Sequence, residues 1–436
     1  MDEQTLLIAR FGLWLLTACT VVLPMRWAFV CFLCAAQFNI VTGSLVGTES
    51  IEIDNAIRIL VLPLILLIRT RFEPLRGLRW TRAHQIWLAL AVYAACATVW
   101  SPYPLSAMKM VCYLFYYLVL FSLLVYAWRN KYLSMKLISA LLWISLLLGA
   151  IQTYVLPDSY GRVTGPFDSR FTSFIDAQSY ATFLVAIVAI LLFADIRGLA
   201  RKATIAVATA GILLTGSRYV SLGVLFLFAI KGLAASDAEG RVHVRVRPRM
   251  LLLGSVALCL VGYLIASEFP DNRLAQLVDV AVEPRYSLED IGTVASRLAL
   301  YQVAFERLAS RNSFGLLFGS GTSSAGEVRF EVDPGFDDAD LDPNRTLHDE
   351  FLRSLYEWGF IGLSLLAAFL LVVTVGFLRQ ARKPGGRSAL GFIGVLPTIF
   401  AALAMENFLT YPSGAGGVGV LLAMSYGIAP ELIAQV

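Results

Sequence analysis

Residues 351–378 read FLRSLYEWGFIGLSLLAAFLLVVTVGFL, and after Glu357 this run carries no charged side chain. A helix needs roughly 20 apolar residues to cross the hydrocarbon core of a bilayer, so the run predicts a transmembrane helix. Similar runs recur along the whole chain. The candidate spans are 6–24, 27–42, 56–69, 85–100, 108–127, 133–156, 177–195, 202–216, 218–235, 250–267, 351–378, 389–410 and 415–430. The sequence therefore predicts an all-α polytopic membrane protein with 12 or 13 transmembrane helices.

The composition agrees with this class. Of 436 residues, 58% are hydrophobic and only 15% are charged, and the mean hydropathy is +0.71. Soluble domains are about a quarter charged. These values exclude a soluble enzyme, a disordered chain and a DNA-binding domain, so no nucleic-acid partner is expected. All six cysteines fall in apolar runs, which excludes a secreted disulfide scaffold.

The charges of the connecting segments alternate strictly along the chain. Segments 69–83, 128–136, 197–202, 231–249 and 379–387 hold 20 Lys and Arg against 3 Asp and Glu. Segments 43–55, 157–176 and 267–350 hold 9 Arg against 22 Asp and Glu. Positively charged loops stay in the cytoplasm. The acidic segments, including the long one at 267–350, are therefore expected on the outer face.

We expect one integrated membrane domain in three parts: an N-terminal bundle (1–266), a large outer loop (267–350) and C-terminal membrane helices (351–436). A loop of this length is unlike a passive connector. Within it, residues 293–311 predict an amphipathic helix, with Val294, Leu298, Tyr301, Phe305 and Leu308 at three-to-four spacing. This helix is expected to lie on the outer leaflet or to pack across the bundle. A glycine-rich turn (314–322) and an acidic stretch (331–342) follow.

His348 and two arginines are the candidate catalytic residues. His348 is the only histidine of the outer segments, and its ordinary pKa suits proton transfer near neutral pH. Arg218 follows Thr215-Gly216-Ser217 at the outer end of two spans, where the positive-inside rule disfavours arginine. Ionisable groups at membrane depth are candidate functional sites. Arg297 lies on the predicted loop helix. Because guanidinium groups bind phosphate oxygens bidentately, this set suits a lipid-linked phosphate or diphosphate.

Competing motifs are weak. Asp338-Ala339-Asp340-Leu341-Asp342 resembles the start of a calcium-binding loop, but Pro343 occupies the position of the required glycine. The chain contains no phosphate-binding P-loop, no H-E-x-x-H and no G-x-S-x-G. We therefore expect no metal and no cofactor.

At these residues the chain resembles the O-antigen ligase and polymerase superfamily, the Wzy/WaaL-like membrane proteins of bacteria. The resemblance covers most of residues 150–380. It rests on four patches in the family's order. They are GRVTGPF (161–167) with DAQSYATFL (176–184), LTGSR (214–218), SRLALY (296–301) with FGSG (318–321), and LHDEFL (347–352) with EWGFIG (357–362). Two positions depart from the family pattern: Asp349 replaces a common Asn, and Tyr301 replaces a common Trp.

The resemblance implies glycosyl transfer from an undecaprenyl-diphosphate-linked glycan on the periplasmic face of the bacterial inner membrane. In that interpretation Arg218 and Arg297 hold the donor diphosphate, and His348 is the general base in an inverting, metal-independent displacement. Preorganised arginines would stabilise the charge that develops on the leaving diphosphate. The substrate-binding candidates are Arg162, Arg345, Tyr301, Glu357 and Asp349. Asp349 could orient His348 or raise its pKa, and Glu357 is more suited to orienting the His348 segment than to chemistry.

The resemblance leaves the reaction open within the family. A polymerase that adds repeat units to a growing polysaccharide (O-antigen, capsule or exopolysaccharide) is the first hypothesis, and a ligase onto lipid A-core or another acceptor is the second. A lipid-carrier or glycan transporter is the alternative of another class, for which Glu406 is the main argument. Family analogy also implies a chain-length regulator as a membrane partner.

Overall fold

The structure is a computed structural model. It describes residues 3–37, 44–46, 49–51, 56–76, 81–150, 177–193, 199–215, 217–236, 242–244, 292–332, 347–382, 387–405 and 409. This part of the chain is predominantly helical, with two short antiparallel hairpins. Each predicted span coincides with a helix over most of its described residues, although at the end of the span at 218–235 Ala234 and Ala235 belong to a strand. The spans predicted at 250–267 and 415–430 lie outside the described residues.

The N-terminal third forms a layer of helices and one hairpin. The first helix ends just before Pro24 and the second begins just after it, as the break in the sequence predicts. The next span begins as a π-helical turn and continues as an α-helix. The elements are α1 (Glu3–Val22), α2 (Met25–Gln37), β1 (Ser44–Val46), β2 (Glu49–Ile51), η1 (Ile57–Val61), α4 (Leu62–Arg69) and α5 (Glu73–Arg76).

The middle of the chain supplies the central helices. A tight connection joins α6 and η2 to α7, which starts with Pro104 at its first position, where proline is well tolerated. The elements are α6 (Arg82–Ala97), η2 (Thr98–Trp100), α7 (Pro104–Arg129), α8 (Met135–Ala150), α10 (Ala177–Phe193), α11 (Leu199–Leu214), α12 (Arg218–Leu233), β3 (Ala234–Ser236) and β4 (Val242–Val244). In the hairpins, Ser44 pairs with Ile51 and Ala234 pairs with Val244.

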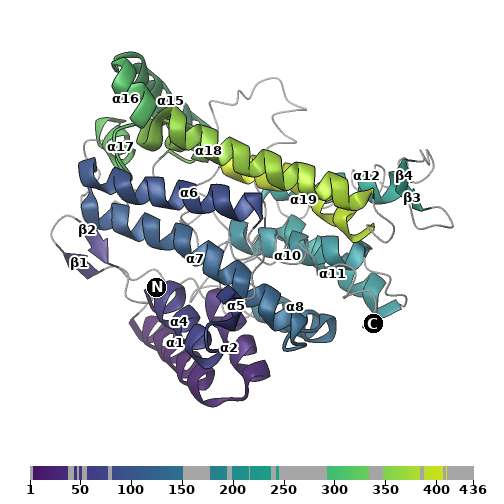
Figure 1. Ribbon diagram of the computed structural model, residues 1–436. Coiled ribbons are helices and arrows are strands. Elements are labelled where there is room, and N and C mark those ends of the chain that lie inside the picture. Colours follow the sequence, from purple (N-terminus) through teal and green to yellow (C-terminus); the bar gives the residue numbers. More distant parts are fainter. Residues whose placement is uncertain are drawn as a thin grey trace.

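The C-terminal part adds three loop helices and two long helices. These are α15 (Gly292–Ala309), α16 (Ser313–Phe318), α17 (Gly326–Val332), α18 (Glu350–Ala381) and α19 (Arg387–Met405). Figure 1 shows α6, α7 and α18 running side by side, with α10 and α19 behind them. α18 packs against both α6 and α19, and α19 against α10 and α12.

Three helices of the described chain are long and apolar enough to cross a membrane: Arg82–Trp100, Pro104–Arg129 and Glu350–Ala381. Further apolar helices are shorter, and these lie in α1, α2, α10, α12 and α19. This architecture is consistent with an all-α membrane protein. α7 is the most enclosed of the three long helices, with 61% of its apolar window buried, whereas only 28% of the apolar window of α18 is buried.

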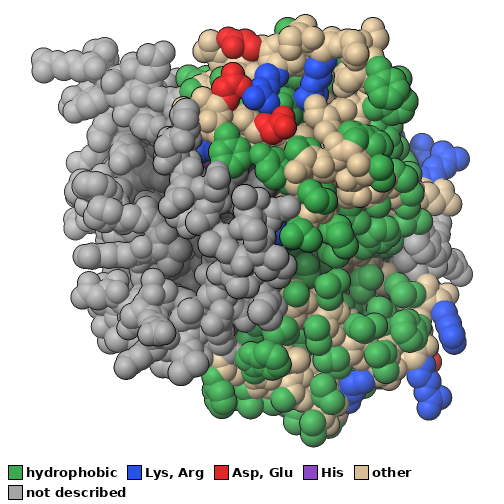
Figure 2. Space-filling model, turned by 90° about the vertical axis from the view of Figure 1, so that its left-hand side faces the viewer, with side chains coloured by type: hydrophobic (Ala, Val, Ile, Leu, Met, Phe, Trp, Pro, Cys, Tyr) green, Lys and Arg blue, Asp and Glu red, His purple; other side chains and the backbone are tan. Residues whose placement is uncertain are grey.

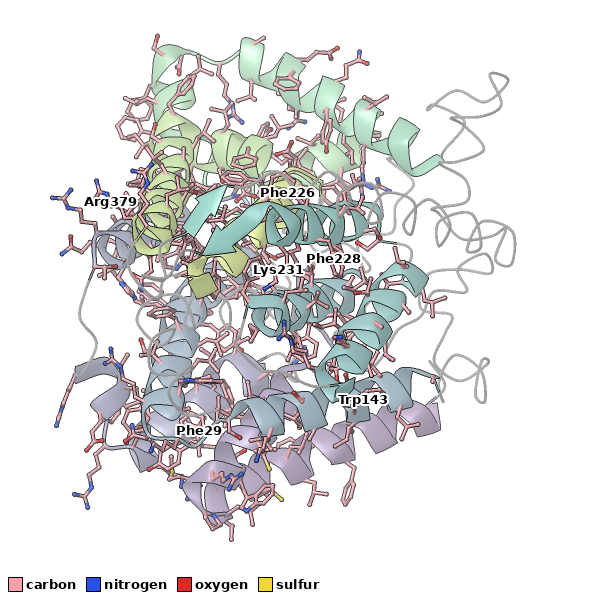
Figure 3. All side chains as sticks on the ribbon, turned by 90° about the vertical axis from the view of Figure 1, so that its right-hand side faces the viewer. Phe29, Trp143, Phe226, Phe228, Lys231 and Arg379 are labelled. Carbon is pink, nitrogen blue, oxygen red and sulfur yellow. The ribbon has the colours of Figure 1, made fainter. Side chains whose placement is uncertain are left out.

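The loop helices and the described basic hairpin β3–β4 lie at opposite ends of this bundle. Figure 1 places α15, α16, α17 and the β1–β2 hairpin at one end, and the β3–β4 hairpin at the other. Figure 3 views the second end, where Lys231 and Arg379 lie in the last turns of α12 and α18. The β1–β2 hairpin and the loop helices, which belong to the acidic segments, are thus separated in space from the β3–β4 hairpin and from the last turns of α12 and α18.

The predicted loop helix is present as α15, but its buried side differs from the one expected. Leu300, Ala304 and Leu308 are buried in a small hydrophobic core with Val328 and Tyr356. By contrast, Leu298 and Phe305 are 50% and 57% exposed. Figures 1 and 3 show α15 lying across the direction of α18. The first half of the predicted glycine-rich turn is also helical, as α16, and residues 319–325 form the non-helical connection to α17.

Candidate functional site

The loop helices form a small platform with its own polar contacts. Arg307 on α15 donates to Glu331 (2.7 Å, from Nε) and to Glu327 (3.1 Å, from Nη1) on α17. It also donates to the hydroxyl of Tyr356 on α18 (3.3 Å). Figure 2, which views this end of the molecule, shows acidic and basic side chains gathered near its upper edge, above a largely hydrophobic surface. Charged contacts therefore fix α15 and α17 to each other and to the start of α18.

The platform is hydrogen-bonded to α18 at the point where that helix is broken. Gly359 has φ 62° and ψ −163°, which no α-helical residue adopts. The break leaves two carbonyl groups of α18 accessible to the turn that follows α16. The N–H of Ser320 donates to the carbonyl of Tyr356 (3.1 Å), and the N–H of Gly321 donates to that of Glu357 (3.0 Å). The turn supplies the hydrogen bonds that the broken helix lacks.

Glycine is required on both sides of this contact. A Cβ atom on Gly319 would lie 2.2 Å from the carbonyl oxygen of Glu357, and one on Gly359 would lie 2.3 Å from that of Leu317. Both residues also have positive φ, which side chains disfavour. The FGSG and EWGFIG segments identified in the sequence thus lie in contact, and their glycines allow two backbones to approach closely.

Thr322 joins the same turn to α6. Its hydroxyl donates to the carbonyl of Ala94 (2.7 Å) and accepts from the indole N–H of Trp358 (3.0 Å). Its own carbonyl accepts from the hydroxyl of Ser101 (2.5 Å). Thr322 and Trp358 are fully buried. This residue therefore ties together the loop, α6 and α18 at one point.

Three charged side chains are fully buried along the first two turns of α18. Arg353 is ion-paired with Glu350 and donates to it from Nε (2.7 Å). The other oxygen of Glu350 accepts from the backbone N–H of Leu409, just after α19 (2.7 Å). Glu357 interacts with the backbone N–H groups of Ser323 and Ala325. Neither of its carboxylate oxygens has a hydrogen bond of ordinary geometry to any described residue.

His348 lies directly before these charges, in a strained backbone conformation. Its φ is +50°, uncommon for a residue with a side chain. The hydroxyl of Tyr301 on α15 donates to the carbonyl of His348 (3.4 Å), and Leu347 beside it is buried. The loop helix therefore contacts the histidine segment directly.

Asp349 has a structural role that the sequence prediction did not include. Its Oδ1 accepts from the N–H groups of Phe351 and Leu352 (2.9 Å each), so it is the N-cap of α18. Burial raises the pKa of this carboxyl, and the two N–H donors only partly oppose that effect. The hydrogen bonds orient the carboxylate toward its own helix.

The structure brings some of the predicted site residues together. Tyr301, His348 and Asp349 are neighbours, and Arg297 lies one turn before Tyr301 on α15, half-buried. Glu357 is further along α18, beside the Thr322 turn. Arg218 is the first residue of α12. The predicted residues Arg162, Arg345 and Glu406 lie outside the described residues, as does the acidic segment 338–342.

Sequence reasoning missed Arg353 and Thr322. Arg353 had a signal: it is an arginine in the first turn of an apolar run, three residues after Glu350 and four before Glu357. That spacing places all three on one side of a helix. Thr322 had none, because its partners are far away in sequence. In the described part of the chain, no group of three or more His, Cys, Asp or Glu is placed to hold a metal ion.

Comparison with known proteins assigns no family. No protein-family model matches the chain, and no curated protein matches it.

Proposed function

We propose that this chain is a membrane glycosyltransferase that polymerises polysaccharide repeat units from an undecaprenyl-diphosphate-linked donor. The supporting observation is the contact between Tyr301 and His348. It links the helix that carries Arg297 to the segment that carries the only histidine of the outer segments. The proposed location is the bacterial inner membrane, with the site facing the periplasm, which agrees with the basic residues lying at the opposite end of the bundle.

In this proposal the reaction is a single displacement at the anomeric carbon of the donor sugar. His348 takes the proton from the attacking hydroxyl of the acceptor. A new glycosidic bond forms as the bond from the anomeric carbon to the phosphate oxygen breaks. The diphosphate leaves with the electron pair, and Arg218 and Arg297 stabilise its charge. Configuration is inverted, and this chain's own residues supply all of these roles.

The platform also has a role. A base contributes to catalysis only when it is held at the correct distance from the acceptor. Hydrogen bonds from Ser320, Gly321 and Thr322 fix the platform on the α6–α18 pair. We infer that this fixed platform sets the position of Tyr301, and through it that of the His348 segment.

A transporter is the second candidate, favoured by a different observation. Glu350, Arg353 and Glu357 are fully buried in a helix of membrane-spanning length, and that helix is broken at Gly359. Buried ionisable groups and broken helices are typical of transporter binding sites. These features lie near the loop end of α18, whereas transporter sites lie near the middle of the membrane, so we rank this function second.

The test compares glycans from strains that carry the wild-type chain, His348→Ala or Arg218→Ala, with Ser313→Ala as an exposed control. Protein levels are checked by immunoblot. Surface polysaccharide length and lipid-linked intermediates are measured together. For a polymerase, the two site variants are made at normal levels but accumulate single lipid-linked repeat units, whereas Ser313→Ala does not.

The same measurement separates the alternatives. Long chains that remain on the lipid carrier indicate a ligase instead of a polymerase. If His348→Ala and Arg218→Ala leave polymer and intermediates unchanged, the proposal of glycosyl transfer at this site is wrong. The transporter hypothesis then becomes the leading one.

A further inference from the structure

The short helix α16 carries an apolar side that the protein does not cover. Phe314 is 69% exposed and Leu317 is 44% exposed. The rings of Phe314 and Phe318 lie 4.6 Å apart, centroid to centroid. The opposite side of α16 is packed on α18 through Gly359. An exposed apolar patch beside a polar platform indicates an interaction surface.

The patch continues onto α18. The carbonyl oxygen of Leu317 lies against Gly359, and the next residue, Phe360, is 52% exposed. All the charged residues at the start of α18, ending with Glu357, precede this point, and the next charged residue is Arg379. α16 therefore lies where α18 changes from a buried, charged segment to an apolar one that is only partly buried.

The length of that apolar segment matches a bilayer. At about 1.5 Å per residue, the helix from Phe360 to Ala381 is roughly 33 Å long, close to the hydrocarbon thickness of about 30 Å. The whole of α18 would be too long by more than two turns. The hydroxyl of Tyr93 on α6 donates to the carbonyl of Phe318 (3.0 Å), so α16 is held by α6 as well as by α18.

We propose that α16 is an interfacial helix whose Phe314 and Leu317 side chains insert among the lipid acyl chains at the outer edge of the bilayer. They continue the lipid-facing surface of α18 that starts at Phe360. The occupant of this patch is the bilayer itself. A six-residue helix is not stable alone, but Asn312 caps this one by accepting from the N–H of Gly315 (2.8 Å). Its attachment to α18 holds it in place.

This arrangement fixes the height of the loop above the membrane. Glu350, Arg353 and Glu357 then lie beyond the hydrocarbon edge, enclosed by protein and not by lipid. His348, which precedes the N-cap of this helix, lies further out again. The inference depends on α18 spanning a bilayer and does not depend on glycosyl transfer.

Spin labels test the inference in reconstituted full-length protein. Single cysteines replace Phe314, Leu317, Phe360 and, as polar exposed controls, Glu306 and Ser313, in a variant that lacks the six native cysteines. Collisions with oxygen, which concentrates in lipid, are compared with collisions with a water-soluble nickel complex. We expect oxygen to dominate at 314, 317 and 360, and nickel to dominate at 306 and 313.

Two results of the spin-label measurement overturn the inference. One is nickel accessibility at 314 and 317 equal to that at 306, which places the patch in water. The other is little access for either reagent, which places it against another protein chain. A second measurement keeps the native cysteines: p-benzoylphenylalanine at position 314 should cross-link to lipid on illumination. Cross-linking to protein instead also overturns it.

Discussion

At the scale of single residues, Gly319 and Gly359 determine whether the loop can dock. Alanine at Gly359 would place Cβ 2.3 Å from the carbonyl oxygen of Leu317 and would hold a side chain at positive φ. That backbone strain alone costs about 1–3 kcal/mol. We expect Gly359→Ala to lower the thermal unfolding midpoint in detergent clearly. Gly376→Ala is the control, since a Cβ there meets nothing within 4 Å and alanine favours a helix. Equal midpoints for the two variants would contradict the proposed role of the close backbone contact between the turn at Gly319 and α18 at Gly359.

Asp349 gives a prediction for pH at the same scale. Burial raises the pKa of its carboxyl in the folded protein. Such a group stabilises the fold fully only below its unfolded pKa, and the contribution is lost as the pH rises through the folded pKa. Asn keeps the capping acceptor without the charge. We therefore expect Asp349→Asn to gain stability relative to wild type as the pH rises from about 4 to 7.

Unfolding midpoints measured across that pH range test this expectation. Asp349→Ala separates the cap from the charge. Because neither Ala nor Asn titrates, Asp349→Ala should be less stable than Asp349→Asn by about 1 kcal/mol at every pH. A constant difference between wild type and Asp349→Asn would show that the carboxyl does not titrate differently in the two states.

At the scale of elements, Thr322 determines how firmly the loop is attached to α6 and α18. Thr322→Val keeps the shape but leaves the buried indole N–H of Trp358 and the carbonyl of Ala94 without their partner. An unsatisfied buried polar group costs about 1–3 kcal/mol. We expect this variant to make segment 292–332 more susceptible to limited proteolysis. Thr322→Ser keeps the hydroxyl and should digest like wild type. Equal digestion of the Val and Ser variants would show that these bonds do not hold the loop.

The helices themselves were largely predictable from the sequence, because the length of each apolar run and the positions of proline residues determine locally where a helix begins and ends. The break at Pro24 and the helix at 292–309 follow from such signals. The buried side of α15 was not predictable. The predicted stripe runs through Leu298, Phe305 and Leu308, whereas the buried one runs through Leu300, Ala304 and Leu308, so the two stripes share Leu308. Only packing against α17 and α18 selects the second.

The site was predictable only as a set of separate segments. Motif reading identified the segments around Gly319, His348 and Gly359, but not that Ser320 and Gly321 donate to the carbonyls freed by the break in α18. That contact depends on the three-dimensional fold. Glu350 shows the same limit, since its partner Leu409 lies beyond α19. Charge and spacing indicate which residues share one side of a helix, and tertiary packing determines what they meet.

At the scale of the whole molecule, the loop platform and the basic helix ends define two faces. α6 and α7 are antiparallel neighbours, and the contact of Thr322 with Ala94 and Trp358 places the start of α18 beside the end of α6. The other end carries Arg129, Lys136, Lys231 and Arg379. If the chain spans a membrane, the positive-inside rule places that second end in the cytoplasm.

Cysteine labelling in intact cells tests this orientation. Ser310→Cys lies on the exposed loop surface between α15 and α16, and Lys136→Cys lies exposed in the first turn of α8. A membrane-impermeant maleimide should label Ser310→Cys in intact cells and label Lys136→Cys only after the membrane is permeabilised. The parent chain, which has the native cysteines alone, gives the background. The reverse pattern would place the loop in the cytoplasm. A loop in the cytoplasm would exclude the proposed periplasmic glycosyl transfer. It would not contradict the hydrogen bonds between the loop and α18.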